Sequence, residues 1–183
     1  PHHLRSVFIE RLRRQAALGE DGRILWKINH LVDTEIIDEL YAASQRGCKI
    51  DLIIRGNCSV MPGVPGLSET ITVRSLVGRF LEHSRIYRFG DPERGTAEYH
   101  IGSADMMTRN LDGRVEILVE VSEPRLVDRL DGILSVEMED DMLAWELKGS
   151  VWSKVPTSAG IDTHATLRAM TVARSQLDSL APQ

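Results

Sequence analysis

The residues best suited to chemistry lie between Phe80 and Tyr87, where His83 and Arg85 stand two positions apart. Residues two apart on a β-strand share one face, and Ser84–Phe89 has the pattern of a strand. A fixed guanidinium can hold the oxygens of a phosphate while a nearby imidazole attacks or protonates it. The pair therefore indicates phosphoryl chemistry, although Arg85 could equally form an ion pair with Glu82 or another carboxylate.

Two further groups could complete an anion site. Gly102 and Ser103 end an expected strand, where small residues let a backbone N–H and a hydroxyl approach an anion closely. Arg55 ends another apolar strand, Lys49–Arg55, and taken alone it fits a surface salt bridge equally well. Ligands of open α/β sheets bind beyond the carboxyl ends of parallel strands. We therefore expect Arg55, Ser103 and the His83 segment to converge on one concave rim.

These side chains need a sheet to bring them together, and the hydrophobic pattern predicts one. Helices are predicted over residues 4–17, 34–46, 124–138, 140–147 and 163–179, with a helical turn at 76–80. Strands are predicted over residues 23–29, 49–55, 70–74, 84–89, 98–103 and 115–121. The first two strands and the helix between them form a βαβ unit, whose strands should be parallel. Strands interleaved with helices indicate the α/β class, in a single domain over 1–183 whose residues 156–183 form a helical tail.

The other residues of chemical interest have structural interpretations. The remaining histidines show no metal-ligand spacing, so no metal site is expected in this chain. The acidic run Glu137–Asp141 has the character of a solvated face with helix capping. Asn110 is expected to fix the loop that follows Ser103, and Cys58 to be a buried spectator thiol.

Composition narrows the class of protein. The chain has 183 residues, of which 42% are hydrophobic and 27% charged, as in an average folded domain. Its net charge of −5 argues against generic nucleic-acid binding, so an anion site would have to be a local basic cluster. Two cysteines fit reduced cytosolic thiols better than a disulfide framework. The chain begins at Pro1 rather than Met, and we expect it to be a piece of something longer.

The chemical motifs resemble the signature of the phospholipase D-like fold in a variant form. The usual pattern is H-x-K, an Asp some residues on, and then G-S-x-N. Here Arg85 stands where Lys is usual, and no Asp follows at the usual short interval. Both departures weaken the interpretation as a plain phosphodiesterase.

The chain resembles the C-terminal part of bacterial polyphosphate kinases much more closely. The densest match is Arg74–Tyr87, followed by Gly102–Leu111. Earlier matches are Lys27–Asp33, Tyr41–Ser44, Lys49–Gly56 with Cys58, and Pro62–Glu69, so that the resemblance covers about Leu4 to Val155. Small departures are Met106, where the family usually has Trp, and Asn57, where an apolar residue is common.

The resemblance implies a phospholipase D-like mixed sheet flanked by helices, as the last of four domains. It implies that the arginine at Arg55 and the histidine at His83 contribute to the ATP site, with His83 in the catalytic role and Arg85 and Ser103 as further phosphate-pocket candidates. The phosphorylated histidine and the Mg²⁺ ligands belong to the preceding domain in this family. The partners implied are ATP, polyphosphate and the remaining domains, in a cytoplasmic homo-oligomer that can associate with membranes when full-length.

The leading interpretation is therefore the C-terminal catalytic domain of an ATP:polyphosphate phosphotransferase, inactive as an isolated fragment. An alternative is a phospholipase D-like phosphodiesterase or nuclease that acts as a homodimer of single-motif chains. A third is a polyanion-binding module without catalytic activity.

Overall fold

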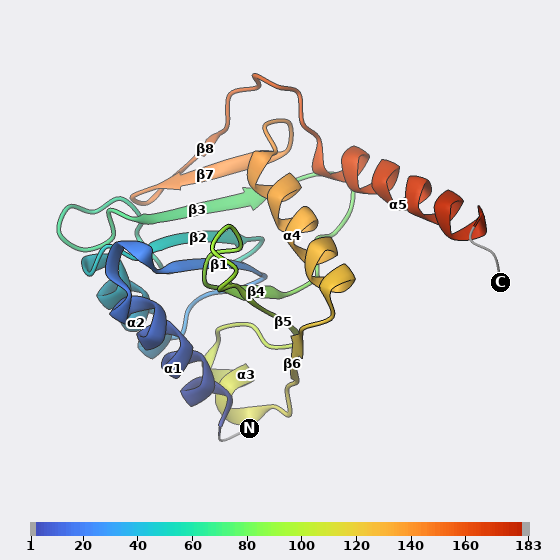
Figure 1. The fold of residues 1–183 in the computed structure, drawn as a ribbon. Helices are drawn as coiled ribbons and strands as arrows, with labels where there is room; N and C mark the ends of the chain where they lie inside the picture. The colour runs from blue at the N-terminus through green and yellow to red at the C-terminus, as the bar shows by residue number, and fades with distance from the viewer. Residues whose placement is uncertain (1–2, 181–183) are drawn as a thin grey trace.

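The computed structural model describes the backbone of residues 3–180 and the side chains of residues 3–176. Within this part, eight strands form one mixed sheet in the order β6-β5-β4-β1-β2-β3-β7-β8 (Figure 1). The strands are β1 Arg23–Ile28, β2 Lys49–Ile54, β3 Ile71–Leu76, β4 Ile86–Phe89, β5 Glu98–Gly102, β6 Leu118–Val121, β7 Ala144–Lys148 and β8 Val151–Lys154. The helices are α1 Leu4–Ala17, α2 Thr34–Gln45, α3 Thr108–Gly113, α4 Pro124–Glu139 and α5 Thr163–Leu180, with a short 3₁₀ turn at Gly19–Asp21.

The centre of the sheet is the predicted βαβ unit. Strands β1 and β2 are parallel over their whole length, and β2 and β3 are parallel as well. Every other pair is antiparallel, including β1 with β4 and β4 with β5. Helix α2 crosses between β1 and β2, and the side chain of Asp33 caps it by accepting a hydrogen bond of 3.2 Å from the backbone N–H of Ile36. The prediction of a mixed sheet flanked by helices is confirmed.

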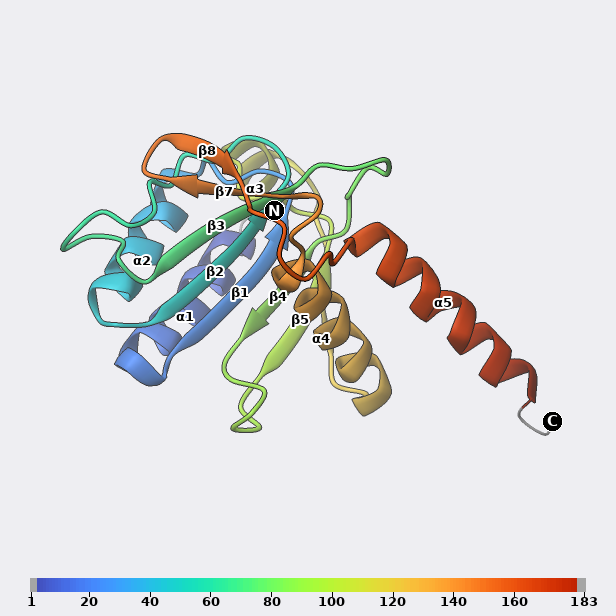
Figure 2. The same cartoon turned by 90° about the horizontal axis from the view of Figure 1, so that it is seen from above.

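Helices cover both faces of the sheet. Helices α1 and α2 lie on one face and α4 on the other, while α5 extends away from the body (Figure 2). On the first face, Phe8 of α1 packs in an aromatic cluster with Trp26, Tyr87 and Phe89, all fully buried. On the second, Leu134 of α4 packs in the cluster that contains Leu25, Ile53 and Ile86 of the central strands. Alternate strand residues therefore serve alternate faces.

The prediction of a helix over 140–147 is wrong. Residues 144–148 form β7, which pairs antiparallel with β3 and turns back into β8, a strand that was not predicted. Helix α4 ends because Asp140 leaves helical conformation and its carboxylate accepts hydrogen bonds from the backbone N–H groups of Leu143 and Ala144. The free edge of β3 then offers pairing that outweighs the weak local preference of this short segment.

The predicted helical turn at 76–80 is also wrong. Strand β3 continues to Leu76 because that residue pairs with Ala144 of β7, and residues 77–85 have no regular structure. The following strand consequently begins at Ile86 rather than at Ser84. The short helix α3 was not predicted.

For the acidic run Glu137–Asp141, the prediction of capping is correct and the prediction of a solvated face is wrong. Its members do cap local structure, but Glu137, Asp140 and Asp141 are buried rather than solvated. The Asp141 carboxylate accepts hydrogen bonds from the backbone N–H groups of Ser158, Ala159, Gly160 and Ile161. The run thereby holds the segment that leads into α5.

Candidate functional site

The topology brings segments that are distant in the sequence to one edge of the sheet. The ends of β1 and β2 meet there because these strands are parallel. The start of β4 lies beside the end of β1, since Lys27 pairs with Ile86, and the end of β5 lies beside the start of β4. The residues just outside these strands therefore gather at the same edge.

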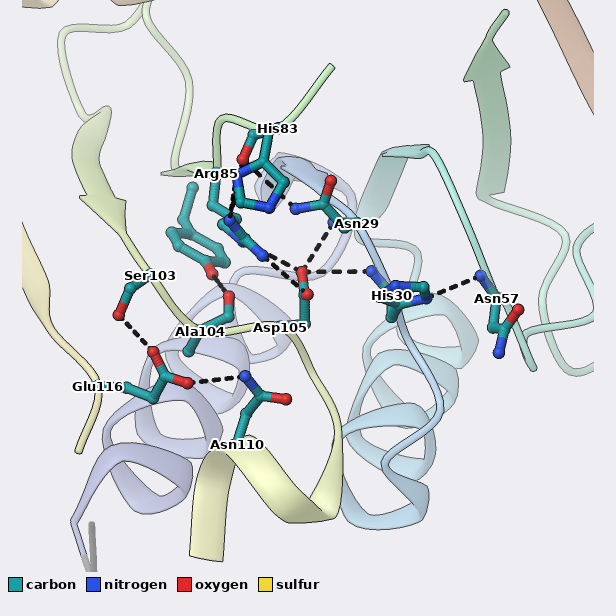
Figure 3. A network of polar contacts seen from close by, with 11 residues as sticks. Asn29, His30, Asn57, His83, Arg85, Ser103, Ala104, Asp105, Asn110 and Glu116 are labelled. Carbon is teal, nitrogen blue, oxygen red and sulfur yellow. Dashed lines mark hydrogen bonds and ion pairs between the residues drawn. The ribbon is translucent and has the colours of Figure 1, made fainter. Parts of the chain in front are cut away.

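An ion pair between Arg85 and Asp105 forms the centre of this cluster (Figure 3). Arg85 Nε and Nη2 donate to the two carboxylate oxygens of Asp105 at 3.3 and 3.0 Å. The backbone N–H groups of Asn29 and His30 donate to the same carboxylate at 2.8 and 3.3 Å. Burial raises the pKa of Asp105, but the bonds from Arg85 and the two amides outweigh it and hold that pKa below its ordinary value.

His83 lies above this pair with an exposed ring. Arg85 Nη1 lies 3.3 Å from the ring Nδ1 and donates to the His83 carbonyl at 2.9 Å. The side-chain amide of Asn29 donates to the same carbonyl at 3.4 Å. The backbone of His83 is thus tied to the sheet edge while the Nε2 side of the ring has no protein partner among the described residues.

Ser103 lies on the other side of Arg85, at the end of β5, and its hydroxyl is already engaged. It donates to the Glu116 carboxylate and accepts from the backbone N–H of Ile117 at 3.0 Å. Asn110 donates to Glu116 at 2.7 Å, in the loop-fixing role expected of it. At Gly102 a Cβ atom would lie 2.7 Å from the Ile117 carbonyl, so the glycine is needed for packing at this edge.

Arg55 reaches the same edge from β2. Its backbone N–H donates to the carbonyl of Ile28, and the next amide, of Gly56, donates to the carbonyl of Asn29. Within the part of the chain described, its guanidinium has no hydrogen-bond or ion-pair partner, and Nε is buried. In the strand alternation Arg55 has the parity of Ile53, which faces the α4 side. A half-buried guanidinium without an internal partner is suited to an external anion.

A cavity of about 580 Å³ opens beside the cluster. Arg85 and Ser103 line it together with Ile86, Ile101 and apolar residues of β6 and α4. The structure therefore places His83 against Arg85, and it places Arg85 and Ser103 on the lining of one cavity. Arg55 lies at the same edge through its backbone bond to Ile28, and the next amide, of Gly56, bonds the carbonyl of Asn29, whose side chain donates to His83.

A cluster of buried charged side chains holds the segment that carries His83. Lys27 of β1 pairs with Glu82 at 3.0 Å and lies 3.5 Å from Glu137 of α4. The ring of His164, in the first turn of α5, bonds Glu82 at 2.8 Å. Since Glu82 precedes His83, β1, α4 and α5 together fix the segment that carries the histidine.

Sequence reasoning missed three of these residues. Asp105 occupies the Asn position of the G-S-x-N pattern, which was the signal available for it. Glu82 and Glu116 were recognisable only as carboxylates near the motifs. Their partners lie 55 and 13 positions away and become neighbours through the sheet.

No group of three His, Cys, Asp or Glu side chains within the described residues could hold a metal ion. None of the helices described is both long and apolar enough to cross a membrane.

Comparison with known proteins assigns the chain to a protein family. A sequence model described as "Polyphosphate kinase C-terminal domain 2" matches residues 1–165. The chain belongs to this family. The polyphosphate kinase of Mycolicibacterium gilvum is 47% identical over 160 residues, which cover 85% of this chain and 21% of that relative. Polyphosphate kinase 1 of Chlorobaculum tepidum is 46% identical over 150 residues, or 80% of this chain and 21% of that relative.

Solved structures agree with the polyphosphate kinase assignment. The crystal structure of the polyphosphate kinase from Porphyromonas gingivalis superposes with a TM-score of 0.85 at 33% identity, covering 94% of this chain and 26% of that one. Nuc from Salmonella typhimurium, a phospholipase D family member, has a TM-score of 0.55 at 16% identity and covers 75% of this chain and 91% of that one. The second likeness shows the fold alone, and it confirms the phospholipase D-like class. The chain spans about a fifth of the length of its curated relatives.

Proposed function

We propose that this chain is the C-terminal catalytic domain of a polyphosphate kinase. It helps transfer the γ-phosphoryl group of ATP to polyphosphate through a phosphohistidine that a preceding domain holds. The observation that supports the proposal is a guanidinium at Arg55 without a partner among the described residues, at the sheet edge beside which His83 is exposed. Membership of the polyphosphate kinase family supports the choice of substrate.

Each site residue has a role in this proposal. Arg55 clamps phosphate oxygens through two parallel N–H bonds, a geometry that a guanidinium supplies and an ammonium does not. His83 donates a hydrogen bond to the phosphoryl group as its charge redistributes during transfer. Arg85 and Ser103 line the neighbouring cavity in secondary roles, because Arg85 contacts His83 and Asp105 and the Ser103 hydroxyl bonds Glu116.

The residues described do not fit a magnesium site. They contain no cluster of three potential ligands, and the carboxylate of Asp105 is already paired with Arg85. No step of the proposed reaction uses a metal ion bound by this domain. We propose that the Mg²⁺ ligands of the enzyme lie in the preceding domain.

The proposal extends to the whole protein. The partners are ATP, polyphosphate and the remaining domains of the same polypeptide, in a cytoplasmic homo-oligomer, and nucleic acid is not among them. The chain acts as one domain, and the segment after residue 156 is a tail that carries α5.

Synthesis by the full-length enzyme tests the function. Purified full-length protein, incubated with γ-labelled ATP and Mg²⁺, should incorporate label into polyphosphate chains. Bis(p-nitrophenyl) phosphate should remain unhydrolysed. Hydrolysis of that diester without polyphosphate synthesis would replace the proposal with the homodimeric phosphodiesterase, and salt-sensitive polyphosphate binding without either activity would indicate a binding module.

A further inference from the structure

We propose that Asp105 and Arg85 are positioning residues that hold the neutral His83 imidazole in one tautomer, with its proton on Nε2. The inference deepens the proposed function, on which its catalytic meaning rests, because only that tautomer donates a hydrogen bond from the open side of the ring. The assignment of the proton itself depends on the geometry around Nδ1 alone.

The argument begins with the donors of Arg85. A guanidinium has five N–H groups and no acceptor. Nε and one N–H of Nη2 are used on Asp105, and Nη1 serves both the carbonyl and the ring Nδ1 of His83. Because Arg85 can only donate, Nδ1 must accept, which it does only when it carries no proton. The proton of a neutral ring is then on Nε2.

Asp105 makes this arrangement specific. Its carboxylate is 5% exposed and is itself fixed by the backbone amides of Asn29 and His30. Two parallel bonds to the Arg85 fork set the plane and the rotation of the guanidinium. The direction of Nη1 toward His83 follows from that plane, so a residue that does not touch the imidazole determines its tautomer.

The same contacts argue against Arg85 as the principal phosphate clamp. Its charge is balanced by Asp105 at 3.0 Å, and four of its five N–H groups are committed within the chain. Arg55 has no such partner within the described residues. The two arginines therefore have different roles: Arg85 holds His83, and Arg55 is open to an anion.

The tautomer can be observed directly in the 183-residue chain labelled with ¹⁵N-histidine. Long-range ¹H–¹⁵N spectra distinguish a protonated from an unprotonated ring nitrogen. We expect His83 in the unsubstituted chain to show an unprotonated Nδ1 and a protonated Nε2. A proton on Nδ1, or an averaged mixture of both tautomers, would overturn the proposal without reference to any activity.

Variants separate positioning from folding. In Asp105→Asn, and in the double variant Arg85→Met with Asp105→Asn, which leaves no buried charge unpaired, the two tautomers should mix. The matched control is Asp131→Asn. It removes the carboxylate from a different ion pair, the one between Arg88 of β4 and Asp131, away from the site. The control should leave the His83 signals unchanged, and an unchanged tautomer in both site variants would contradict the proposal.

Kinetics of the full-length enzyme give the second readout. Asp105→Asn should lower kcat by about 10-fold while KM for ATP changes by less than about 2-fold, because orientation rather than binding is lost. A rise in KM equal to that of Arg55→Ala would assign Arg85 to phosphate binding and overturn the positioning role. If the unsubstituted enzyme makes no polyphosphate, the proposed function fails, while the spectra still decide the tautomer.

Discussion

At the scale of single residues, the two arginines at this edge of the sheet differ in whether a carboxylate balances their charge. Arg85 is neutralised by a buried carboxylate, whereas Arg55 has a buried Nε without a hydrogen bond and no carboxylate partner in the described part of the chain. An unsatisfied buried donor is costly unless something binds it. The ligand of the site is therefore expected to bind at Arg55.

Replacement of either proposed phosphate ligand should lower activity strongly. In the full-length enzyme, His83→Ala and Arg55→Ala are each expected to lower synthesis by about 10²-fold or more, since one preorganised donor is typically worth about 3 kcal/mol in the transition state. Polyphosphate formation from labelled ATP measures the loss, and circular dichroism should show an unchanged fold. Near-normal turnover of either variant would leave that residue with a structural role only.

The shape of the cation should matter as well as its charge. Arg55→Lys and Arg55→Gln are expected to remain at least about 10-fold below the unsubstituted enzyme, because neither offers two parallel N–H donors. Lys49→Arg, at an exposed position at the other end of β2, is the matched control and should change nothing. Full activity of Arg55→Lys would show that the site needs only a point charge.

Ser103 should matter less than its place in the motif suggests. Its hydroxyl donates to Glu116, so it can donate to a phosphate only by giving up that bond. Ser103→Ala is therefore expected to reduce kcat/KM by less than about 10-fold in the full-length enzyme. A loss as large as that of His83→Ala would show that the hydroxyl turns to the phosphate during the reaction.

At the scale of elements, the segment before β4 is fixed by charges buried between β1 and α4. Glu137 of α4 is 0% exposed, and among described atoms neither of its carboxylate oxygens has a hydrogen bond. Burial raises the pKa of Glu137 to about 8, although the charge of Lys27 opposes the shift. Burial on the sheet therefore favours the protonated form of this carboxyl group.

The raised pKa makes stability depend on pH. The contribution of Glu137 is fully present below its unfolded pKa near 4.5 and is lost as pH rises toward 8, at up to about 1.4 kcal/mol per pH unit. Glu137→Gln should remove this slope, which urea unfolding at several pH values measures. The exposed neighbour Glu139, replaced as Glu139→Gln, should keep the slope of the unsubstituted chain. An equal slope in Glu137→Gln would show that Glu137 is ionised in the folded state.

A second element depends on one carboxylate. The backbone N–H groups of Ser158 to Ile161 outweigh burial and hold the pKa of Asp141 below its ordinary range. Asp141→Ala should free the segment that leads to α5, so amide exchange at residues 158–161 should accelerate by about 10-fold. Asp128→Ala, at an exposed position on α4, should leave that exchange unchanged. Unaltered exchange in Asp141→Ala would mean that other contacts hold the segment.

At the scale of the whole molecule, the proposed function implies that this chain supplies only one half of a phospholipase D-like centre. The H-x-R motif at His83–Arg85 is followed by the G-S step at Gly102–Ser103, and the chain spans about a fifth of its polyphosphate kinase relatives. A single half can bind an anion but lacks the opposed histidine that would carry the phosphoryl group.

The isolated chain should therefore make no polyphosphate. Incubated with γ-labelled ATP and Mg²⁺, it is expected to incorporate label neither into polyphosphate nor into its own histidines. The full-length enzyme under the same conditions is the positive control. Polyphosphate formation by the isolated chain would show that two copies pair to form a complete centre.

The sequence by itself determined the elements whose pattern is local. The bounds of α1 and the parallel βαβ unit were predictable, because apolar spacing acts over a few residues. The sequence also named His83, Arg85, Ser103 and Arg55 as candidates, through motifs that survive at fixed spacing.

Only the tertiary structure decided what is non-local. The segment 144–148 is a strand because β3 offers it an edge, an interaction that lies about 70 positions away in the chain and leaves no local signal. Likewise, the sequence left Arg85 free to pair with Glu82 or with any other carboxylate. The antiparallel pairing of β4 with β5 brings Asp105 to Arg85, and the antiparallel pairing of β4 with β1 brings Glu82 to Lys27. The sequence gives the type of each side chain. The pairing of the strands determines which charged side chains become neighbours.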